Sequence, residues 1–228
     1  LRTPLTSMRW FSEMLLDGDA GKVSKKQKHF LERIYEGTDR MISLVNLLLQ
    51  IARVDAGRIR VEPTPLDIRK ITEEVMEAIK IQLKNKSQKV KITAKPAKLP
   101  LIPMDKEVIW QVVLNLLTNA NRYSGVDSVI LVKIENKYDH LEFSIVDKGI
   151  GIPKSQQDQI FKKFFRADNA FKKVPEGSGL GLSLVKSLVD SWGGKVWFES
   201  EEKKGTTFYF TIPKSGMIAK TGEVGLAV

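Results

Sequence analysis

The first 56 residues contain two consecutive stretches of helical periodicity, and this pattern constrains the fold more than any other. The first carries apolar residues at helical spacing, Leu5, Met8, Phe11, Met14 and Leu15, and ends at the glycine-containing segment 17–21. The second opens at Ser24 with Gln27 three residues on, a capping-box pattern, and continues with Phe30, Ile34, Met41, Leu44, Val45, Leu48 and Ile51 at near-heptad spacing. Two helices alone cannot enclose a core. We therefore expect a homodimer through residues 1–56, in which two hairpins form a four-helix bundle.

The amino-acid composition excludes several classes of functional site and partner. The 228-residue chain is 42% hydrophobic and 28% charged, which is ordinary for a globular protein. It has no cysteine, which excludes disulfides, zinc–thiolate sites and cysteine nucleophiles and fits a cytoplasmic location. The net charge of +10 comes from dispersed lysines, so we expect a solvated surface and no nucleic-acid partner. No run is apolar enough to span a bilayer, so any membrane attachment is expected upstream of Leu1, which we interpret as a fragment boundary.

After residue 57 the pattern changes to helices mixed with strands. Residues 58–66, with two prolines, predict a linker between a hairpin domain at 1–57 and a second domain at 67–215, and residues 216–228 form a tail. Asp67 and Asp105 are expected to cap helices that end near Leu83 and Tyr123. Further predicted elements are helices near 159–164 and at 180–192, and strands at 90–94, 129–134, 141–147, 195–199 and 206–212. This succession predicts an α+β fold with a two-layer α/β sandwich.

Asn115 and Asn119 stand four residues apart in the second of these capped helices, so their carboxamides share one face. Arg122 is close to the same face. Oxygen ligands suit Mg²⁺, and a guanidinium neutralises phosphate. The pattern indicates a site for magnesium-bound phosphates, and a polar helix face is the alternative interpretation of this motif taken alone.

Two glycine-containing segments follow. In residues 147–153, Asp147 ends a predicted strand, and its carboxylate can accept a hydrogen bond from an exocyclic amine such as that of adenine; a β-turn is the alternative. Residues 177–182 lead into a helix whose free amides and positive dipole end favour phosphate. This segment follows a loop and lacks Gly-Lys-Ser/Thr, so neither the dinucleotide fingerprint nor the P-loop fits.

In this order the motifs resemble those of sensor histidine kinases, and the resemblance extends to about Ser215. The segments that carry it are 115–124 (similar to the N box), 147–153 (first glycine box), 161–166 (F box), 177–182 (second glycine box), 205–208 (a minor glycine box) and 1–6 (the tail of the H box). The resemblance implies a HisKA-type dimerisation and histidine phosphotransfer hairpin followed by a GHKL-type, or Bergerat-type, ATP-binding domain.

The resemblance also implies the cofactors ATP and Mg²⁺ and a role for each matching residue. Asn119 would bind Mg²⁺, and the catalytic candidates are Asn115, beside the phosphates or the metal, and Arg122, where the family usually has lysine. Asp147 would accept from the adenine amine. The other implied ATP contacts are Tyr123, Gly149, Gly151, Ile152, Phe164, Arg166, Gly177, Ser178, Gly179, Leu180, Gly181, Leu182 and Thr207. Residues 154–178 would be a mobile lid that Phe161, Phe164 and Arg166 help close.

The implied activity is that of an ATP-dependent protein-histidine kinase, which passes a phosphoryl group to a histidine and then to an aspartate on a response-regulator receiver domain. The family's phosphoacceptor histidine and adjacent acidic residue stand immediately before the stretch matched by residues 1–4, so both are expected outside this sequence. His29 and His140 match no H box and are expected to be surface residues. Thr3 matches the position that orients water for dephosphorylating the regulator, and an ordinary first-turn helix residue is the alternative.

Two alternatives belong to other classes. A non-catalytic, nucleotide-binding dimeric scaffold would also lack the acceptor residues. An ATPase of the related gyrase and mismatch-repair type would use an acidic residue on the N-box helix to activate water, and this chain has Asn115 in the equivalent region. The histidine kinase is therefore the preferred interpretation.

Overall fold

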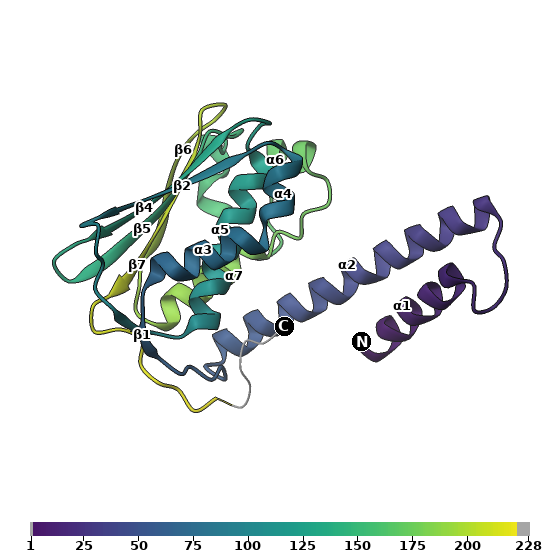
Figure 1. Ribbon diagram of the computed structural model, residues 1–228, viewed down its shortest axis with the longest axis horizontal. Helices are drawn as coiled ribbons and strands as arrows, with labels where there is room; N and C mark the ends of the chain where they lie inside the picture. Colours follow the sequence, from purple (N-terminus) through teal and green to yellow (C-terminus); the bar gives the residue numbers. More distant parts are fainter. Residues whose placement is uncertain (1, 223–228) are drawn as a thin grey trace. The chain divides into compact units, whose positions relative to one another are not determined.

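The computed structural model describes residues 2–222, which form two compact units. The first unit ends at Gln50, and the second begins at Ile51. Helix α2, which spans Lys25–Asp55, is continuous through this boundary (Figure 1).

The first unit is a helical hairpin of α1 (Arg2–Asp17) and the greater part of α2. The break between the helices contains Gly18 and Gly21, whose φ angles of +90° and +102° suit glycine. The predicted capping box is present: the Ser24 amide donates to Gln27 Oε1 at 2.8 Å, and the Gln27 amide donates to Ser24 Oγ at 3.3 Å. These local features stop one helix and start the next as the sequence predicts.

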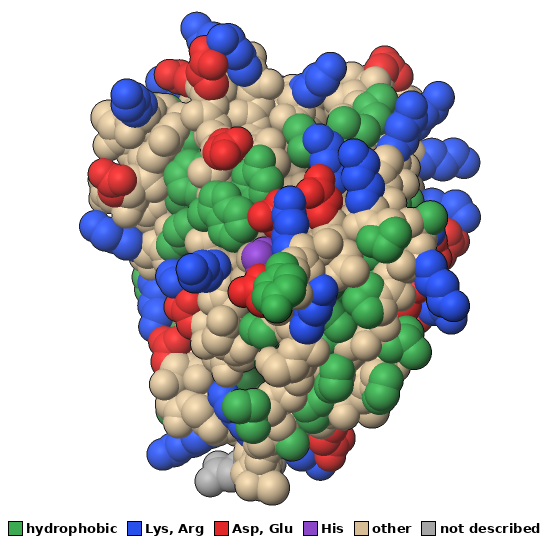
Figure 2. Space-filling view, turned by 90° about the vertical axis from the view of Figure 1, so that its left-hand side faces the viewer, with side chains coloured by type: hydrophobic (Ala, Val, Ile, Leu, Met, Phe, Trp, Pro, Cys, Tyr) green, Lys and Arg blue, Asp and Glu red, His purple; other side chains and the backbone are tan. Residues whose placement is uncertain are grey.

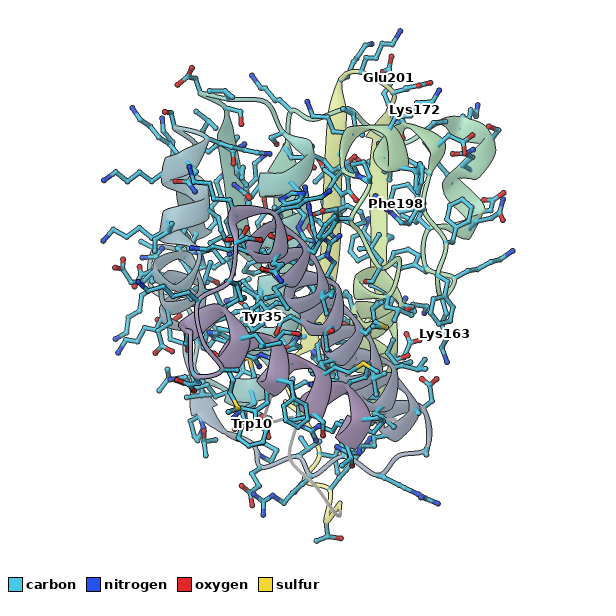
Figure 3. The ribbon with its side chains drawn as sticks, turned by 90° about the vertical axis from the view of Figure 1, so that its right-hand side faces the viewer. Trp10, Tyr35, Lys163, Lys172, Phe198 and Glu201 are labelled. Atoms are coloured by element: carbon cyan, nitrogen blue, oxygen red, sulfur yellow. The ribbon has the colours of Figure 1, made fainter. Side chains whose placement is uncertain are left out.

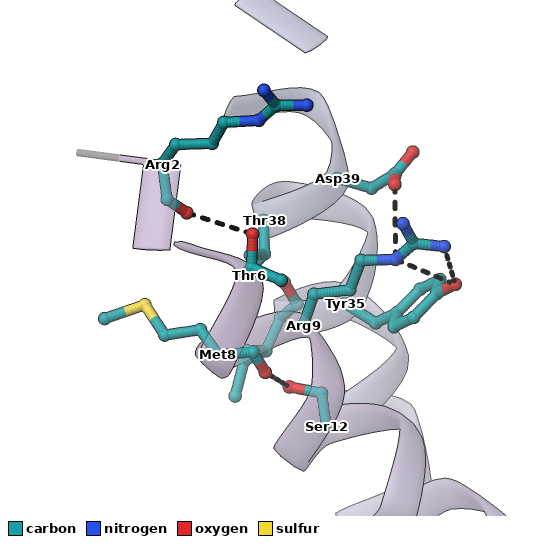
Figure 4. Close-up of polar contacts among 9 residues, drawn as sticks. Arg2, Thr6, Met8, Arg9, Ser12, Tyr35, Thr38 and Asp39 are labelled. Carbon is teal, nitrogen blue, oxygen red and sulfur yellow. Dashed lines mark hydrogen bonds and ion pairs between the residues drawn. The ribbon is translucent and has the colours of Figure 1, made fainter. Parts of the chain in front are cut away.

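A polar cluster centred on Arg9 connects the two helices of the hairpin (Figure 4). The Arg9 guanidinium donates to the Tyr35 hydroxyl at 3.2 Å and lies 3.5 Å from the Asp39 carboxylate. The guanidinium also stacks over the Tyr35 ring at 5.5 Å. Because these side chains are partly exposed, the cluster sets the pairing of the helices more than it adds to stability.

Between Arg2 and Gln50 no apolar side chain is buried in the single chain. Large apolar residues are more than half exposed on both helices; they are Met8, Trp10, Phe11, Phe30 and Ile34 (Trp10 is labelled in Figure 3). A stripe of this kind requires a second apolar surface to exclude water.

The second unit is a two-layer α/β sandwich (Figure 1), which confirms the predicted fold class. Its mixed sheet has the order β2-β4-β5-β7-β6, in which β2 and β4 are parallel and the other neighbouring pairs are antiparallel. The strands are β2 Lys89–Lys95, β4 Val129–Asn136, β5 His140–Asp147, β6 Val196–Glu201 and β7 Gly205–Pro213. Helices α3 Ile68–Ala78, α5 Lys106–Tyr123 and α7 Gly181–Ser191 cover one face. Alternation along the strands sends residues such as Phe143 and Phe210, whose rings stack at 4.8 Å, into the core.

The other face of the sheet is open to solvent and mixes apolar side chains with charges of both signs (Figure 2). Lys137 there forms ion pairs with Glu135 at 2.6 Å and Glu142 at 3.8 Å, and Trp197 stacks on Tyr209 at 5.0 Å. The alternation of the strands thus accounts for one buried and one solvated face.

Residues 58–66 differ from the predicted linker because they pack into the second unit. Ile59 and Val61 are buried, Val61 forms a β-bridge with Lys220, and β1 (Thr64–Leu66) pairs with β3 (Ile102–Met104). The tail also packs as far as the structure describes it, because the Met217 amide donates to the Pro103 carbonyl at 2.8 Å. Residues 223–228 of the predicted tail lie outside the described range.

Two predicted helices are corrected. Asp67 caps a helix as expected, but the helix ends at Ala78, and α4 (Lys80–Asn85) restarts after Ile79, whose side chain is buried. No helix spans 159–164; a 3₁₀ helix η1 covers Lys154–Gln159, and α6 covers Asp168–Lys173. Residues 160–164 form turns instead of a helix. Ile160 is buried there, and Phe164 takes the left-handed φ of +65°, which interrupts a helix.

Candidate nucleotide-binding site

The N-box helix α5 is oriented by its cap and its apolar face. Asp105 Oδ1 accepts from the amides of Glu107 at 3.0 Å and Val108 at 3.1 Å, as the sequence predicts. The buried side of the helix is formed by Val108, Ile109, Val112, Val113, Leu116, Leu117 and Ala120. This packing leaves Asn115 and Asn119 half-buried and Arg122 exposed.

The Asn115 side chain meets the second glycine motif. Its Nδ2 donates to the Gln111 carbonyl at 2.8 Å. Its Oδ1 faces Gly181, where an added Cβ would lie 2.9 Å from that oxygen. The Asn119 carboxamide has no hydrogen-bond partner within residues 2–222, so its oxygen is available to a ligand. The first and third motifs of the sequence therefore meet at the start of α7.

Asp147 is a buried carboxylate at the end of β5, with 7% of its surface exposed. Burial raises the pKa of Asp147 to about 6, and hydrogen bonds from the backbone amides of Gly149 and Thr206 oppose this shift. The Gly149 amide donates to its Oδ1 at 2.8 Å. Asp147 is therefore mostly ionised at pH 7 and can accept a hydrogen bond in a site with little water.

Both glycines after Asp147 lie against protein backbone. A Cβ on Gly149 would lie 2.6 Å from Asp147 Oδ1 and 2.8 Å from the Tyr123 carbonyl, so this turn touches the end of the N-box helix. Gly151 has φ +62°, and a Cβ there would lie 2.0 Å from the Glu201 carbonyl. The half-buried Ile152 donates its amide to Ser200 Oγ at 2.9 Å. The first glycine motif is thus held between α5 and the β6–β7 hairpin.

Of the two threonines at the start of β7, Thr206 lies beside Asp147 and Thr207 does not. Thr206 is buried and stands opposite Asp147 in the β5–β7 register. Because side chains alternate along a strand, Thr207 points to the opposite face, where it contacts Tyr209. The register of β7 against β5 therefore places Thr206, and not Thr207, beside Asp147.

Arg166 makes several contacts within its own segment, residues 154–178, which we call the lid. Its guanidinium donates to the carbonyls of Ala170 (3.1 Å), Val174, Pro175 (2.8 Å) and Gly177 (3.1 Å) and stacks on Phe171 at 5.3 Å. A Cβ on Gly177 would come within 2.8 Å of this guanidinium. The structure therefore accounts for Arg166 and Gly177 through contacts inside the lid.

The F-box segment packs against the second glycine motif. Phe161 meets Phe198 of β6 edge-on at 6.0 Å (Phe198 is labelled in Figure 3). The Phe164 amide donates to the Gly179 carbonyl at 3.0 Å, while the Phe164 ring is 62% exposed. Gly179 has φ +69°, and a Cβ there would lie 2.7 Å from the Phe164 carbonyl carbon. The Phe164 ring, predicted as an ATP contact, points to solvent in this arrangement.

Helix α7 begins directly after that motif. Ser178 Oγ accepts from the Leu180 amide at 3.2 Å, Leu180 is buried, and Leu182 is half-buried. This packing holds the helix N-terminus beside Asn115. Free amides and the positive end of the helix dipole at this place suit an anionic group.

Asp55, in the last turn of α2, has contacts that its sequence position did not indicate. Its carboxylate accepts from Lys163 Nζ of the lid at 2.8 Å and from Ser187 Oγ of α7 at 2.7 Å. Burial opposes ionisation, but the hydrogen bonds from Lys163 and Ser187 outweigh it and lower the pKa of Asp55. All three residues belong to the second unit, so the last turn of α2 is part of the support of the lid.

We expect Asp55→Ala to lower stability by only about 0.5 kcal/mol, because the ion pair is partly exposed. It should nevertheless increase amide hydrogen exchange in residues 160–165. Since the pKa of Asp55 is lowered, its contribution is present above the unfolded-state value and is lost as the pH falls through its folded pKa. The control is Asp190→Ala, which removes an equally exposed ion pair with Lys186. Equal exchange in both variants would contradict support of the lid by Asp55.

Three further residues singled out in the sequence, Thr3, His29 and His140, lie on α1, on α2 and at the start of β5. Thr3 is exposed in the first turn of α1, and its carbonyl accepts from Ser7 Oγ at 3.2 Å. His29 is exposed on α2, and His140 Nδ1 lies 2.6 Å from the Asp139 carboxylate. Among the described residues, no group of three or more His, Cys, Asp or Glu side chains is placed to hold a metal ion. Across residues 2–222, no helix has both the length and the apolar character needed to cross a membrane.

The chain thus combines a helical hairpin with a sandwich in which the N-box helix meets both glycine motifs. The family described as "Histidine kinase-, DNA gyrase B-, and HSP90-like ATPase" matches residues 104–216. The family described as "His Kinase A (phospho-acceptor) domain" matches residues 1–57. The chain belongs to the histidine kinases, which confirms the resemblance seen in its motifs.

Individual proteins agree with this assignment. The chain is 34% identical over 215 residues to sensor protein kinase WalK of Staphylococcus aureus, covering 93% of this chain and 51% of that protein. The crystal structure of full-length ShkA in complex with AMPPNP has a TM-score of 0.79 and 25% identity, covering 96% of this chain and 44% of that one. Histidine kinase ThkA in complex with the response regulator protein TrrA shares the fold, with a TM-score of 0.67, 21% identity and coverage of 93% and 60%. The chain spans about half or less of the length of the curated relatives it matches.

Proposed function

We propose that this chain is the catalytic core of a sensor histidine kinase, which binds Mg-ATP and transfers its γ-phosphoryl group to a histidine and then to an aspartate of a response regulator. One observation carries the proposal: the buried Asp147, the N-box helix and the second glycine motif are brought together by close contacts at Gly149 and Gly181. A buried, ionised carboxylate is costly without a partner, and the amine of an adenine nucleotide would supply one at this place.

In the proposed complex Asp147 accepts a hydrogen bond from the adenine amine, which selects adenine over bases without that donor. The amides at the start of α7 and the exposed Arg122 face the phosphates. The bond between the γ-phosphorus and its bridging oxygen breaks, with its electron pair leaving on ADP. An N–P bond forms to the histidine, which loses a proton. In the second step the N–P bond breaks and an O–P bond forms to the aspartate. Positioning and charge neutralisation are the main contributions of the protein.

Magnesium fits the available groups. The uncommitted carboxamide of Asn119 supplies an oxygen, Asn115 lies one turn away, and the remaining ligands would be phosphate oxygens and water, as Mg²⁺ prefers. The ion would neutralise charge on the phosphates. The scarcity of acidic clusters in the described residues is compatible with a metal that arrives with its nucleotide.

The proposed partners follow from the hairpin and from the relatives. The exposed stripe from Met8 to Ile34 supports a homodimer through residues 1–56. The family's acceptor histidine would stand directly before Leu1, so the receiver domain is proposed to dock on the hairpin; ThkA, which shares the fold, forms a complex with the response regulator protein TrrA. Thr3, exposed on the first turn of α1, is the proposed residue for dephosphorylating the regulator. We place the reaction in the cytoplasm, where ATP is abundant.

The test uses the full-length protein with Mg²⁺ and γ-labelled ATP. We expect acid-labile, base-stable label on the protein, and Asn119→Ala should reduce the labelling rate about a hundredfold because it removes a group that stabilises charge at the phosphates. Asn85→Ala, an exposed residue at the end of α4, is the matched control and should label normally. Acid-stable label, or full labelling of Asn119→Ala, would contradict the proposal.

A further inference from the structure

The last turns of the N-box helix α5 carry three of the proposed nucleotide-binding residues: Asn119, Arg122 and Tyr123. The final carbonyls of a helix have no partners within the helix, and such ends fray unless other groups bind them. The placement of Arg122 and Tyr123 therefore depends on what holds this helix end.

Lys86, which lies outside every sequence motif, binds the carbonyls at this end. Its Nζ donates to the carbonyls of Asn121 at 2.7 Å, Arg122 at 2.8 Å and Ser124 at 3.4 Å. An ammonium has three donors, so these bonds use its full capacity. A positive charge at a helix C-terminus is also favoured by the helix dipole.

Gln88 completes the arrangement two residues later. Its Nε2 donates to the carbonyls of Asn121 at 3.3 Å and Gly125 at 2.8 Å, and its Oε1 accepts from Asn121 Nδ2 at 2.7 Å. Gln88 and Asn121 are both buried. The carbonyl of Tyr123, between these bonded groups, is the one that lies against Gly149. The turn 86–88 thus supports the end of α5 and, through it, the loop beside Asp147.

Positively charged side chains are concentrated around Lys86. Within the described residues no acidic side chain pairs with Lys86 or Arg122. Burial, and then the charges of Lys173 of the lid and of Arg122, lower the pKa of Lys86. An uncompensated group of cations raises the local affinity for an anion such as a triphosphate.

We propose that Lys86 is a positioning residue for the nucleotide: its ammonium group fixes the last turn of α5 and so sets where Arg122 and Tyr123 meet the ligand. This role rests on the proposed binding of ATP. It assigns to an unremarkable lysine, between α4 and β2, a function that none of the sequence motifs contains.

The test compares Lys86→Met, which keeps the length of the side chain, with Lys86→Arg and with Lys84→Met, an exposed lysine in the last turn of α4. Dissociation constants for AMPPNP are measured by calorimetry on the 228-residue chain, at a temperature where circular dichroism shows each variant folded. We expect Lys86→Met to weaken binding about tenfold. Lys86→Arg should recover most of the loss because a guanidinium can also donate to several carbonyls, and Lys84→Met should bind normally. A purely structural role would lower only the unfolding temperature.

A double-mutant cycle tests whether Lys86 acts through Arg122. If it does, Lys86→Met should cost less than threefold in an Arg122→Gln background, whereas independent roles would give additive losses and overturn the positioning role. Unchanged affinity in Lys86→Met, with a parent chain that binds AMPPNP, would overturn this inference alone. A parent chain that bound no adenine nucleotide would overturn both it and the proposed function.

Discussion

Replacing Asp147 with alanine is expected to weaken AMPPNP binding about a hundredfold, the largest loss of affinity for any single substitution in the site. The carboxylate is buried at the end of β5, and the Gly149 amide orients one of its oxygens. In the proposed complex its removal would leave the adenine amine without an acceptor where water has little access. Isothermal calorimetry on the 228-residue chain measures the loss. A variant that binds within threefold of the parent would exclude Asp147 as the adenine acceptor.

Asp147→Asn removes the negative charge of the side chain and keeps nearly the same shape. The pKa of about 6 lies above the ordinary aspartate value of 3.8, so ionised Asp147 opposes folding at neutral pH, and this cost is absent below the unfolded-state pKa. The Asp147→Asn variant should therefore be more stable than the parent at pH 7, by up to about 3 kcal/mol, although it binds the nucleotide less tightly. Adenosine affinity of the parent should fall as the pH drops through about 6, and that of Asp147→Asn should not. Parallel pH profiles for the two proteins would contradict this assignment.

Gly151→Ala is expected to cause the largest loss of stability, about 3 kcal/mol or more. The glycine has φ +62°, and an added Cβ would lie 2.0 Å from the Glu201 carbonyl, a backbone atom that cannot rotate away. The loop after Asp147 would have to separate from the β6–β7 hairpin. We expect the unfolding midpoint of the second unit to fall by roughly 10 °C.

Gly125→Ala is the matched control. Gly125 lies in the same unit, its φ is not positive, and nothing is within 4 Å of an added Cβ. This substitution should shift the midpoint by no more than about 2 °C. If both alanine variants melted alike, the tight contact at Gly151 would not govern the stability of this loop.

Features set by neighbouring residues were predictable from the sequence. The caps at Ser24, Asp67 and Asp105 depend on hydrogen bonds that span two or three residues, and all are present. The fold class followed from the succession of periodic segments, and the resemblance to histidine kinases followed from short motifs in a fixed order. In each case the physical cause lies within a few residues of the pattern.

Features that depend on distant partners were not predictable. Prolines made residues 58–66 resemble a linker, but Val61 pairs with Lys220, more than 150 residues away in the sequence. The exchange of Thr207 for Thr206 required the register of β7 against β5. Lys86 could not be singled out, because its three acceptors are contributed by the end of a helix over 30 residues later.

The last turn of α2 limits where this protein can be divided and recombined. Ile51 and Val54 are buried in the second unit, although they lie in the same helix as the apolar stripe of the hairpin. A cut at residue 57, where the match to the hairpin family ends, would remove both side chains from the core of the second unit and Asp55 from its contacts with Lys163 and Ser187. An exchange of catalytic units between kinases should therefore succeed when the splice lies before residue 51.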